Sequence, residues 1–444
     1  MIHGQSLPVW ATQLPKTWTA RRLKYDATFN DDKLPEDFPE DADIDYIEIS
    51  DVSQLRGVER FETIAFADAP SRARRKLKPG DTLLSTVRTY LKAVAFVDES
   101  VANSVASTGF AVVRPGQRFN PRFLSWVLQS DIFVNEVVSY SVGVSYPAIN
   151  AVDVANLIAI QPPLHVQQAI AAHLDRETAK IDTLIAKKRE LVAKLKEQRS
   201  ALISRTVTRG LLPEAAKAAG LDPNPPMKDS GVEWLGEVPG HWGVKKISHL
   251  AVVVRGASPR PAGDERYFNG DFMPWITVAD VTKDEHTYLT ESYSMLTEEG
   301  VGFSRKIESD TLILTNSGAT LGVPKITKLT GCANDGIVAF PWLSSSISQH
   351  FLYTVFTALT GLLREKIRQG SGQPNLNTDI VKAICVAVPP IDEQEAIVAF
   401  VKQKIFGIVT CSDAVETAIT RLTEYRAALI TAAVTRQLAI ASAE

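Results

Sequence analysis

Cysteine and histidine are scarce in this chain of 444 residues. Its three cysteines, Cys332, Cys385 and Cys411, form no C-x-x-C pair, so we expect neither a disulfide framework nor a structural zinc site. The seven histidines show no H-x-x-x-H spacing, and the pair His165 and His173 is typical of a solvated helix. The composition therefore predicts a reduced, cytoplasmic protein without a metal site.

Long apolar runs and cofactor loops are missing as well. No stretch approaches the roughly 18 apolar residues of a membrane-spanning helix, and the start MIHGQSLPVW is unlike a signal peptide. The chain has no G-x-x-x-x-G-K-[ST] loop and no G-x-S-x-G elbow, and GSGQPN from Gly370 has no lysine. The N-P-P-M sequence from Asn224 has Met where amino-methyltransferases have an aromatic residue, so a linker is favoured. We expect no catalytic residues and no membrane association.

What the chain does contain is a second copy of itself. Residues 146–211 align with residues 373–438 without a gap, at a constant offset of 227. WATQLPKTWTARRL from Trp10 matches WLGEVPGHWGVKKI from Trp234, and YIEISDVS from Tyr46 matches WITVADVT from Trp275. A period of about 220 residues is too long for a solenoid, since each copy can bury its own core. The sequence therefore predicts a duplicated domain.

Within each copy, the sequence pattern changes once from a mixed region to a long helical region. A mixed region with short apolar runs, such as 81–87 and 93–97, predicts strands separated by turns, and a Pro-Pro pair then precedes a long helical pattern. We predict an α+β protein with two tandem mixed α/β domains, each followed by a long helix. The predicted boundaries are 1–163 for the first domain, 164–212 for the central helix, 213–233 for an Ala, Pro and Gly-rich linker, 234–390 for the second domain and 391–444 for the C-terminal helix.

The two helical patterns have complementary heptads. Apolar residues fall at a and d positions in both, with small residues in one helix where the other has large ones. Such complementarity predicts that the helices pack on each other as an antiparallel coiled coil. The residues predicted to form this contact are Ile181, Leu184, Leu191, Leu195 and Leu202 in the first helix and Ile408, Val415, Leu422, Tyr425 and Leu429 in the second.

Charge is nearly balanced overall, at -3, but uneven along the chain. Between Arg56 and Lys92 nine basic residues accompany four acidic ones, whereas residues 26–45 are strongly acidic. The run SRARRKLK is consistent with phosphate contact and equally with a solvated face. In the second copy, basic residues are scattered among side chains able to read base edges. The DNA-contact candidates are Arg56, Arg72, Arg74, Arg75, Lys76, Arg88, Arg255, Arg260, Arg305, Lys306, Asn316, Ser317, Thr320, Gln373 and Asn375.

The first copy contains PPLHVQQAI and KEQRSALISRTVTRGL, and the second contains PPIDEQEAI and TEYRAALITAAVTRQL. Taken together, these motifs resemble those of the DNA-specificity subunit of type I restriction-modification systems. SYPAIN, GSGQPNLN and DSGVEWLGEVPGHW fit the same pattern, so the likeness covers nearly the whole chain. The first copy departs from it at His165-Val166, where an acidic residue usually precedes Gln.

The resemblance implies a DNA-recognition function. Each mixed region would be a target-recognition domain for one half of a split DNA site, and the paired helices would be a spacer. A helix of about 35 residues would be roughly 50 Å long, or about 15 base-pair steps. Because the mixed regions have diverged, the site should be asymmetric. The resemblance also implies two methyltransferase subunits, which carry S-adenosylmethionine and methylate adenine, and restriction subunits that use ATP and Mg; this chain would bind none of these cofactors.

Other classes of protein fit less well. A methyltransferase fused to its recognition domains would need a cofactor loop, and a pure coiled-coil scaffold would not need two large divergent domains. A solitary DNA-binding regulator stays open, because the sequence does not reveal whether partner subunits exist. The regulator should bind its site tightly alone, whereas a specificity subunit should copurify with a methyltransferase.

Overall fold

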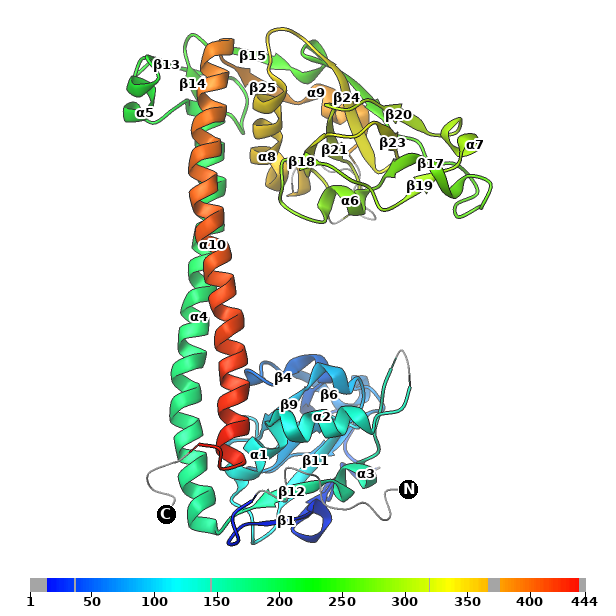
Figure 1. Ribbon diagram of the computed structural model, residues 1–444, viewed down its shortest axis with the longest axis vertical. Coiled ribbons are helices and arrows are strands. Elements are labelled where there is room, and N and C mark those ends of the chain that lie inside the picture. Colours follow the sequence, from blue (N-terminus) through cyan, green and yellow to red (C-terminus); the bar gives the residue numbers. More distant parts are fainter. Residues whose placement is uncertain (1–13, 36, 144–145, 319, 366–375, 439–444) are drawn as a thin grey trace. The chain divides into compact units, whose positions relative to one another are not determined.

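The computed structural model describes residues 14–35, 37–143, 146–318, 320–365 and 376–438 (Figure 1). The chain forms two compact units, residues 1–190 with 415–444 and residues 191–414. The division crosses both long helices, α4 (Leu164–Arg209) and α10 (Ile391–Val434). Each unit therefore contains one mixed domain and a segment of each helix.

The first unit has two four-stranded sheets beside short helices. Its elements in chain order are β1 (Thr19–Arg22), η2 (Leu23–Tyr25), β2 (Ala27–Phe29), β3 (Asp43–Ile47), η3 (Ile49–Asp51), β4 (Val52–Ser53), β5 (Gly57–Val58), β6 (Glu62–Ala65), η4 (Phe66–Asp68), β7 (Ala73–Lys76), β8 (Thr82–Ser85), η5 (Thr89–Leu91), β9 (Val94–Phe96), β10 (Val105–Ser107), β11 (Phe110–Pro115), α1 (Pro121–Gln129), α2 (Asp131–Ser139), α3 (Ala151–Asn156) and β12 (Ile158–Gln161). The sheets have the orders β2-β11-β8-β9 and β6-β3-β10-β7, β1 pairs with β12, and β4 pairs with β5. The predicted strands at 81–87 and 93–97 are confirmed as β8 and β9.

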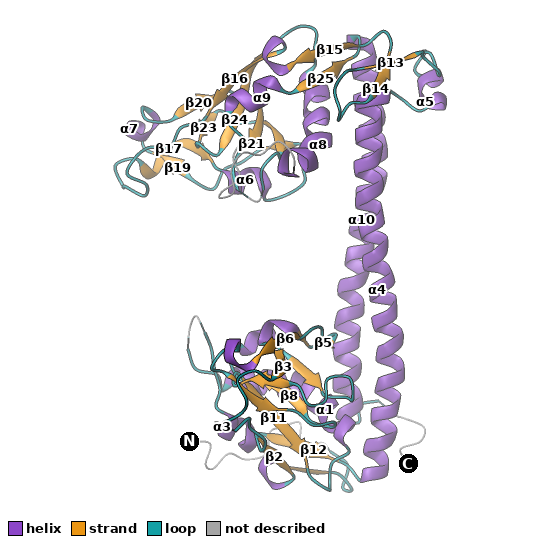
Figure 2. Ribbon diagram, turned by 180° about the vertical axis from the view of Figure 1, so that it is seen from behind, coloured by secondary structure: helices purple, strands orange, loops and turns teal. Residues whose placement is uncertain are grey.

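The second unit repeats this topology with one strand added to one of its sheets. Its elements are α5 (Pro213–Ala218), β13 (Met227–Asp229), β14 (Glu237–Pro239), β15 (Gly243–Lys246), η6 (Ile247–His249), β16 (Ala251–Arg255), β17 (Phe268–Ile276), α6 (Val278–Thr282), β18 (Tyr288–Leu289), β19 (Met295–Leu296), α7 (Glu298–Val301), β20 (Arg305–Ile307), β21 (Leu312–Thr315), β22 (Pro324–Thr327), β23 (Gly331–Ala333), β24 (Ile337–Leu343), α8 (Gln349–Glu365), α9 (Thr378–Ala383) and β25 (Cys385–Val388). The sheets β16-β24-β21-β22-β18 and β19-β17-β23-β20 and the pair β15-β25 are counterparts of those in the first unit, and Figure 2 shows strands and helices by colour. In both units the second sheet contains one parallel pair, β3 with β10 and β17 with β23. The duplication therefore extends to strand order.

A buried glutamine fixes the start of each long helix. Gln167 on α4 accepts a hydrogen bond from the backbone N–H of Asn120 at 2.7 Å, and its Nε2 donates to the carbonyls of Arg118 and Pro162 at 2.9 and 2.8 Å. These bonds satisfy a fully buried amide at the point where the helix leaves the domain. The Q of the P-P-x-x-x-Q motif therefore joins helix and domain. Asn120 also caps α1, because its side chain accepts from the N–H of Phe123 at 2.9 Å.

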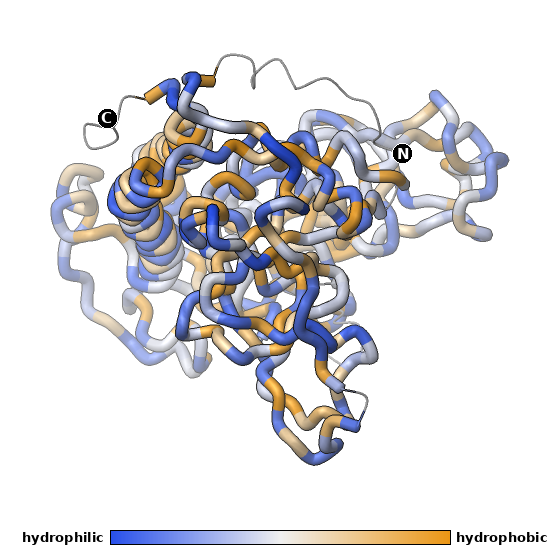
Figure 3. The backbone as a smooth tube through the Cα atoms, turned by 90° about the horizontal axis from the view of Figure 1, so that it is seen from below, coloured by the Kyte–Doolittle hydropathy of each residue, from blue (hydrophilic) through white to orange (hydrophobic). Residues whose placement is uncertain are grey.

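The long helices pack antiparallel, as predicted. In the first unit, Ile181 and Ile185 of α4 share a core with Leu429 and Ile430 of α10. In the second unit, the later α4 residues Ile203 and Val207 share a core with Ile397 and Val401, near the start of α10. Early α4 thus meets late α10, and late α4 meets early α10. Figure 3 shows hydrophobic and hydrophilic residues interspersed along the chain.

The packing seam differs in part from the heptad prediction. Ile181, Val415 and Leu429 are buried, whereas Leu195, Leu202, Ile408 and Leu422 are half-buried. Leu184, Leu191 and Tyr425 are 44%, 43% and 59% exposed, and the buried residues are Ile185 and Val192. Where two apolar residues are adjacent, periodicity does not determine which one faces inward, because an ideal helix drifts relative to a strict heptad. The helices have 46 and 44 residues, more than the expected 35.

The segment after α4 is more ordered than a linker. α4 ends at Arg209, and Gly210 follows with φ +78°, the left-handed conformation that ends many helices. The next residues form α5, whose Ala216 is buried in the core of the second unit, and β13, which pairs with β14. The predicted linker at 213–233 therefore contains a short helix, α5, and contributes one residue to the core. Among the described residues, no helix is long and apolar enough to cross a membrane.

Candidate nucleic-acid interface

The two edge strands β7 and β20 carry basic residues at equivalent positions. In the first unit, Arg75 of β7 lies opposite Ala106 of β10, and Lys76 lies opposite Val105. In the second unit, Arg305 lies opposite Ala333 of β23, and Lys306 lies opposite Cys332. Because β10 and β23 occupy the same place in their sheets, the two Arg-Lys pairs are structural counterparts. An alignment without strand register does not reveal this match, since the surrounding residues differ.

Among the residues that the structure describes, Arg75 has no counterion and its Nε has no hydrogen-bond partner. The side chain is half-buried, and burial lowers its pKa from the ordinary value. Within the described part of the chain, Arg74, Arg75, Lys76 and Arg88 form no ion pair. A partly desolvated cation is stabilised by an anion, so these residues are suited to hold phosphate groups. Arg74 lies at a bulge of β7, where its guanidinium covers the ring of Phe66 at 5.0 Å.

Most other cations of this region are already paired. Arg56 binds Glu59 at 2.9 Å, and Arg72 binds Glu48. Lys78 and Arg114 bind Asp32 at 2.8 and 2.6 Å. The hydrogen bonds from Lys78 and Arg114 lower the pKa of Asp32 to about 2. Part of the acidic segment is therefore neutralised by the basic run, which explains how the two coexist in one domain.

In the second unit, two candidate arginines meet at one loop. Arg255 donates its Nε to the carbonyl of Asp335 at 2.8 Å, and Arg260 forms an ion pair with the Asp335 carboxylate at 3.1 Å. Lys306 pairs with Glu308 at 3.0 Å, whereas Arg305 is exposed on its edge strand. The geometry therefore leaves Arg305 available for a partner, as it does Arg75.

A seven-residue loop follows β8 in the first unit and β21 in the second. Residues 86–92 lie between Ser85 and Ala93, and residues 316–322 lie between Thr315 and Val323; both pairs are joined by a backbone hydrogen bond, at 2.9 and 3.0 Å. Asn316 occupies the place of Thr86, since their N–H groups donate to Gly336 and Gly109 at 2.9 and 2.8 Å. The amide of Asn316 is fully buried and has no hydrogen-bond partner among the described residues, so it does not present a base-reading group at the surface.

The remaining polar candidates lie in or near the same loop. Ser317 and Thr320 are half-buried within residues 316–322. Arg88, in the corresponding loop of the first unit, is exposed and lies over the ring of Tyr146 at 5.0 Å. Gln373 and Asn375 lie outside the described residues. The structure thus groups Arg88, Ser317 and Thr320 on equivalent loops but leaves two candidates untested.

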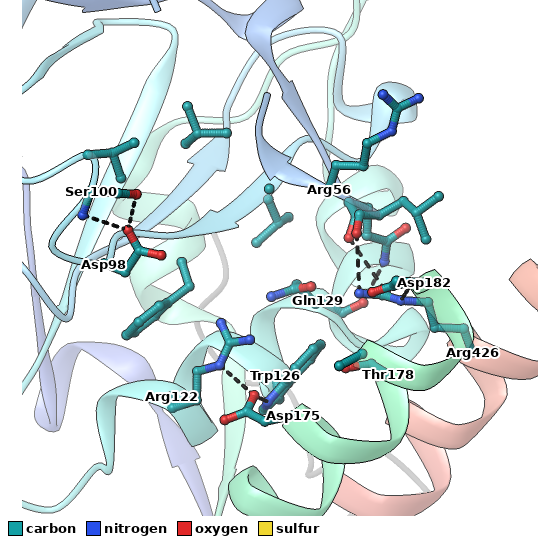
Figure 4. Close-up of a pocket in the computed structure, with 18 residues that line it drawn as sticks. Arg56, Asp98, Ser100, Arg122, Trp126, Gln129, Asp175, Thr178, Asp182 and Arg426 are labelled. Carbon is teal, nitrogen blue, oxygen red and sulfur yellow. Dashed lines mark hydrogen bonds and ion pairs between the residues drawn. The ribbon is translucent and has the colours of Figure 1, made fainter. Parts of the chain in front are cut away.

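A polar pocket of about 280 Å³ lies where the first domain meets the long helices (Figure 4). Arg122 of α1 donates its Nε to Asp175 of α4 at 2.6 Å, and Trp126 Nε1 donates to the same carboxylate oxygen at 3.0 Å. The Arg122 guanidinium covers the rings of Phe96 and Trp126 at 4.8 and 4.6 Å. This cluster joins domain and helix, and the sequence offered no signal for it.

The second long helix is also tied to the first domain. Arg426, on α10, is buried; its Nε donates to Asp182 of α4 at 2.9 Å, and its terminal nitrogens approach the carbonyls of Gln54 and Leu55 at 3.5 and 3.4 Å. Burial raises the pKa of Asp182 above its ordinary value, and Arg426 opposes that shift. Arg426 thus connects α10 to α4 and to the loop 54–56 between β4 and β5.

The equivalent arginine makes a related contact in the second unit. Arg199 of α4 aligns with Arg426 at the offset of 227 and binds Glu285, which follows α6. By the offset of 229, Glu285 corresponds to Arg56, in the loop that Arg426 approaches. Each motif arginine therefore contacts the domain that belongs to the other repeat. Within residues 14–438 as described, no cluster of three or more His, Cys, Asp or Glu side chains could hold a metal ion.

The sequence is similar to those of known proteins. The family model for the type I restriction modification DNA specificity domain matches residues 15–193 and 239–408. The type I restriction enzyme MjaIX specificity subunit of Methanocaldococcus jannaschii is 29% identical over 164 residues, 37% of this chain and 38% of that protein. The HindI specificity subunit of Haemophilus influenzae is 24% identical over 411 residues, 82% of this chain and 87% of that protein.

A solved structure has the same fold. A chain from a study of complex assembly and conformational transition of the type I R-M system superposes with a TM-score of 0.66 at 22% identity, over 95% of this chain and 98% of that one. At this identity the likeness concerns the fold. The family model, in contrast, matches more than half of the sequence in two copies, and the chain therefore belongs to the type I restriction-modification DNA specificity family.

Proposed function

We propose that this chain is the DNA-specificity subunit of a type I restriction-modification complex and recognises an asymmetric split DNA site. The observation that supports this most directly is the pair of equivalent edge strands, on which Arg75 and Arg305 are both free of ion pairs among the described residues. Two counterpart cationic strands suit two half-sites, while the divergent loops beside them suit two different sequences.

In this proposal the chain is not catalytic. Two methyltransferase subunits would carry S-adenosylmethionine and methylate adenine, and restriction subunits would use ATP and Mg. The long helices would serve as spacer and as docking surface for the methyltransferases, in the cytoplasm. The named relatives, both specificity subunits of type I restriction enzymes, support these partners. Family membership does not favour the alternative, a solitary regulator.

Modified-base sequencing tests the proposal. The host genome is sequenced with the gene present and then deleted, with the neighbouring genes left intact. Loss of methyladenine at one asymmetric split motif is the expected result. If every methylated motif persists after the deletion, although the parent strain expresses the intact gene together with its methyltransferase, the chain does not direct methylation. Direct DNA-binding measurements would then test the alternative, a solitary regulator.

The spacer role has a separate test. Removing residues 192–198 from α4 and 410–416 from α10 keeps the helical phase within about 20° and leaves the residues Asp182, Arg199 and Arg426 in place. Seven residues span roughly 10 Å, so the unread part of the motif should shorten by about three base pairs. A methylated motif with unchanged spacing would exclude the helices as the ruler, provided the variant still directs methylation.

A further inference from the structure

The corresponding loops 86–92 and 316–322 differ in a way that stability alone does not explain. Both adopt positive φ at their third and seventh residues. In the second unit these are Gly318 (φ +75°) and Gly322 (φ +86°), which adopt such angles freely. In the first unit they are Arg88 (φ +50°) and Lys92 (φ +51°), for which the conformation is strained. The first loop therefore keeps two cationic side chains where glycine would fit better.

The base of the first loop is firmly held. Thr89 is buried, and its hydroxyl forms a hydrogen bond with Ser141 at 2.7 Å. Thr86 Oγ1 donates to the carbonyl of Gly109 at 2.9 Å, and Lys92 Nζ binds Asp131 at 3.2 Å. The N–H of Lys92 donates to the carbonyl of Thr89 at 3.0 Å and closes the single turn η5. Several independent bonds thus over-determine the strained conformation, which is typical of functional sites.

This rigid base presents two apolar side chains to solvent. Tyr90 is 54% exposed and Leu91 is 48% exposed, and both lie between Arg88 and Lys92. In the second unit, the residue at the place of Leu91 is Leu321, which is 0% exposed and packs in the core, while Thr320 takes the place of Tyr90. The same loop therefore folds its leucine inward in one unit and outward in the other. The exposed side chains of Tyr90 and Leu91 add nothing to the core of the first unit, so they are suited to contact a partner molecule.

We propose that Tyr90 and Leu91 form a wedge that inserts between base pairs and unstacks one step in the half-site read by the first unit. This inference rests on the proposed function. Duplex DNA is the partner that fits the chemistry: Arg88, which forms no ion pair among the described residues, contacts a phosphate, while an apolar tip replaces part of the stacking that the opened step loses. A tip of this kind kinks the duplex, and it recognises the step by how easily it opens.

The position of the loop supports DNA as the partner. The N–H of Thr108 donates to the carbonyl of Arg72, the residue before β7, at 2.8 Å. The next residue, Gly109, accepts from Thr86 at the base of the loop, also at 2.8 Å. The loop is thus linked through two residues to the strand that carries Arg74, Arg75 and Lys76. A duplex held along that strand has the wedge beside it. The equivalent loop of the second unit, in its described residues, exposes no large apolar side chain, so we expect only one half-site to be distorted.

Fluorescence of 2-aminopurine provides the test. The full complex with methyltransferase subunits is mixed with duplexes that contain its methylated motif, and 2-aminopurine is placed at each position of both half-sites in turn. The wild type should give a several-fold rise at one step of one half-site, besides the rise at the methylated adenine, which methyltransferases extrude themselves. The double variant Tyr90→Ser with Leu91→Ser should lose the first rise, keep the second, and bind about tenfold more weakly.

Two further variants separate the wedge from general damage. Tyr25→Ser is the matched control, because Tyr25 is also an exposed tyrosine beside a cation, Arg21, but it does not lie in a loop with positive φ. This variant should leave the fluorescence pattern unchanged. Arg88→Gly restores the residue type of the second unit and should keep the loop folded while it lowers the salt dependence of binding.

The outcomes are distinguishable. Specific binding without a wedge-dependent rise in either half-site would overturn the wedge and leave the proposed function intact. Loss of the methyltransferase from the complex in the double variant would show that the tip docks a protein instead, and would also overturn the wedge. A wild-type complex that binds no motif specifically would contradict the proposed function itself.

Discussion

Gln167 and Gln394 make the same three hydrogen bonds in the two units. Gln394 accepts from the N–H of Ser348 at 2.8 Å, and it donates to the carbonyls of Ser346 and Pro389 at 2.9 and 2.8 Å, as Gln167 does with its own neighbours. Neither side chain is exposed. The two glutamines thus fix each long helix to its domain by main-chain contacts, so the neighbouring side chains are free to diverge.

Replacement of either glutamine should destabilise its unit strongly. Gln394→Leu leaves one N–H and two carbonyls buried without their partner, which should cost about 2–3 kcal/mol of unfolding free energy. Urea unfolding measures the loss, and Gln198→Leu, at an exposed position of α4, is the matched control. Equal unfolding midpoints for the two variants would contradict a structural role for the buried amide.

The two motif arginines should differ in their contribution to stability. Arg426 is buried and its partner Asp182 is one-third exposed, whereas Glu285, the partner of Arg199, is 70% exposed. Arg426→Met leaves Asp182 half-buried without its cation and should cost about 2 kcal/mol. Arg199→Met should cost less than about 1 kcal/mol, as is usual for exposed pairs. Thermal unfolding of both variants under one set of conditions gives the comparison, and a larger loss for Arg199→Met would refute it.

The duplication, the strand–helix division and the antiparallel helices were predictable because they follow from repetition and periodicity. The glutamine of the P-P-x-x-x-Q motif could be identified in the sequence. Its role could not, because that role depends on carbonyl groups that only the folded chain brings close to it. The joint of Arg122 with Asp175 was not visible, because its members lie in different elements and the second copy has His350 and Lys402 in their places. The match between Arg75 and Arg305 required strand register. Residue type alone does not reveal burial, as at Asn316, whose polar side chain is buried in the fold.

The counterpart of that joint, His350 with Lys402, should make the second unit slightly sensitive to acid. His350 is exposed at the surface, and partial desolvation, followed by the charges of Lys328 and Lys402, lowers its pKa from the ordinary value of 6.5, while Asp310 opposes the shift. The folded state therefore binds a proton at lower pH than the unfolded state does. It follows that stability is full above pH 7 and falls as the pH drops through 6.5, where the unfolded chain takes up the proton first.

His350→Gln should flatten this dependence. Glutamine can still form a hydrogen bond with the hydroxyl of Tyr288, which His350 Nε2 contacts at 2.9 Å, but it does not titrate. Urea unfolding at pH 8 and pH 5.5 gives the difference in free energy for each variant. The variant should lose less stability on acidification than the wild type, and His165→Gln, at an exposed position of α4, should behave as the wild type does. An unchanged slope in His350→Gln would assign the acid sensitivity to other groups.

The edge-strand arginines, Arg75 and Arg305, should contribute to DNA-binding affinity but not to sequence specificity. If Arg75 and Arg305 each hold one phosphate, Arg75→Gln and Arg305→Gln should each reduce the slope of log K against log salt by about one, and the double variant by about two. Because phosphate contacts carry no base information, affinity should fall by a similar factor for the methylated motif and for unrelated DNA. Arg72→Gln is the matched control, since Arg72 is already paired with Glu48 and also donates to the hydroxyl of Tyr46 at 3.1 Å. Binding isotherms from 50 to 200 mM salt on the full complex decide the matter. A slope that changes in Arg72→Gln but not in Arg75→Gln would contradict a phosphate contact at Arg75.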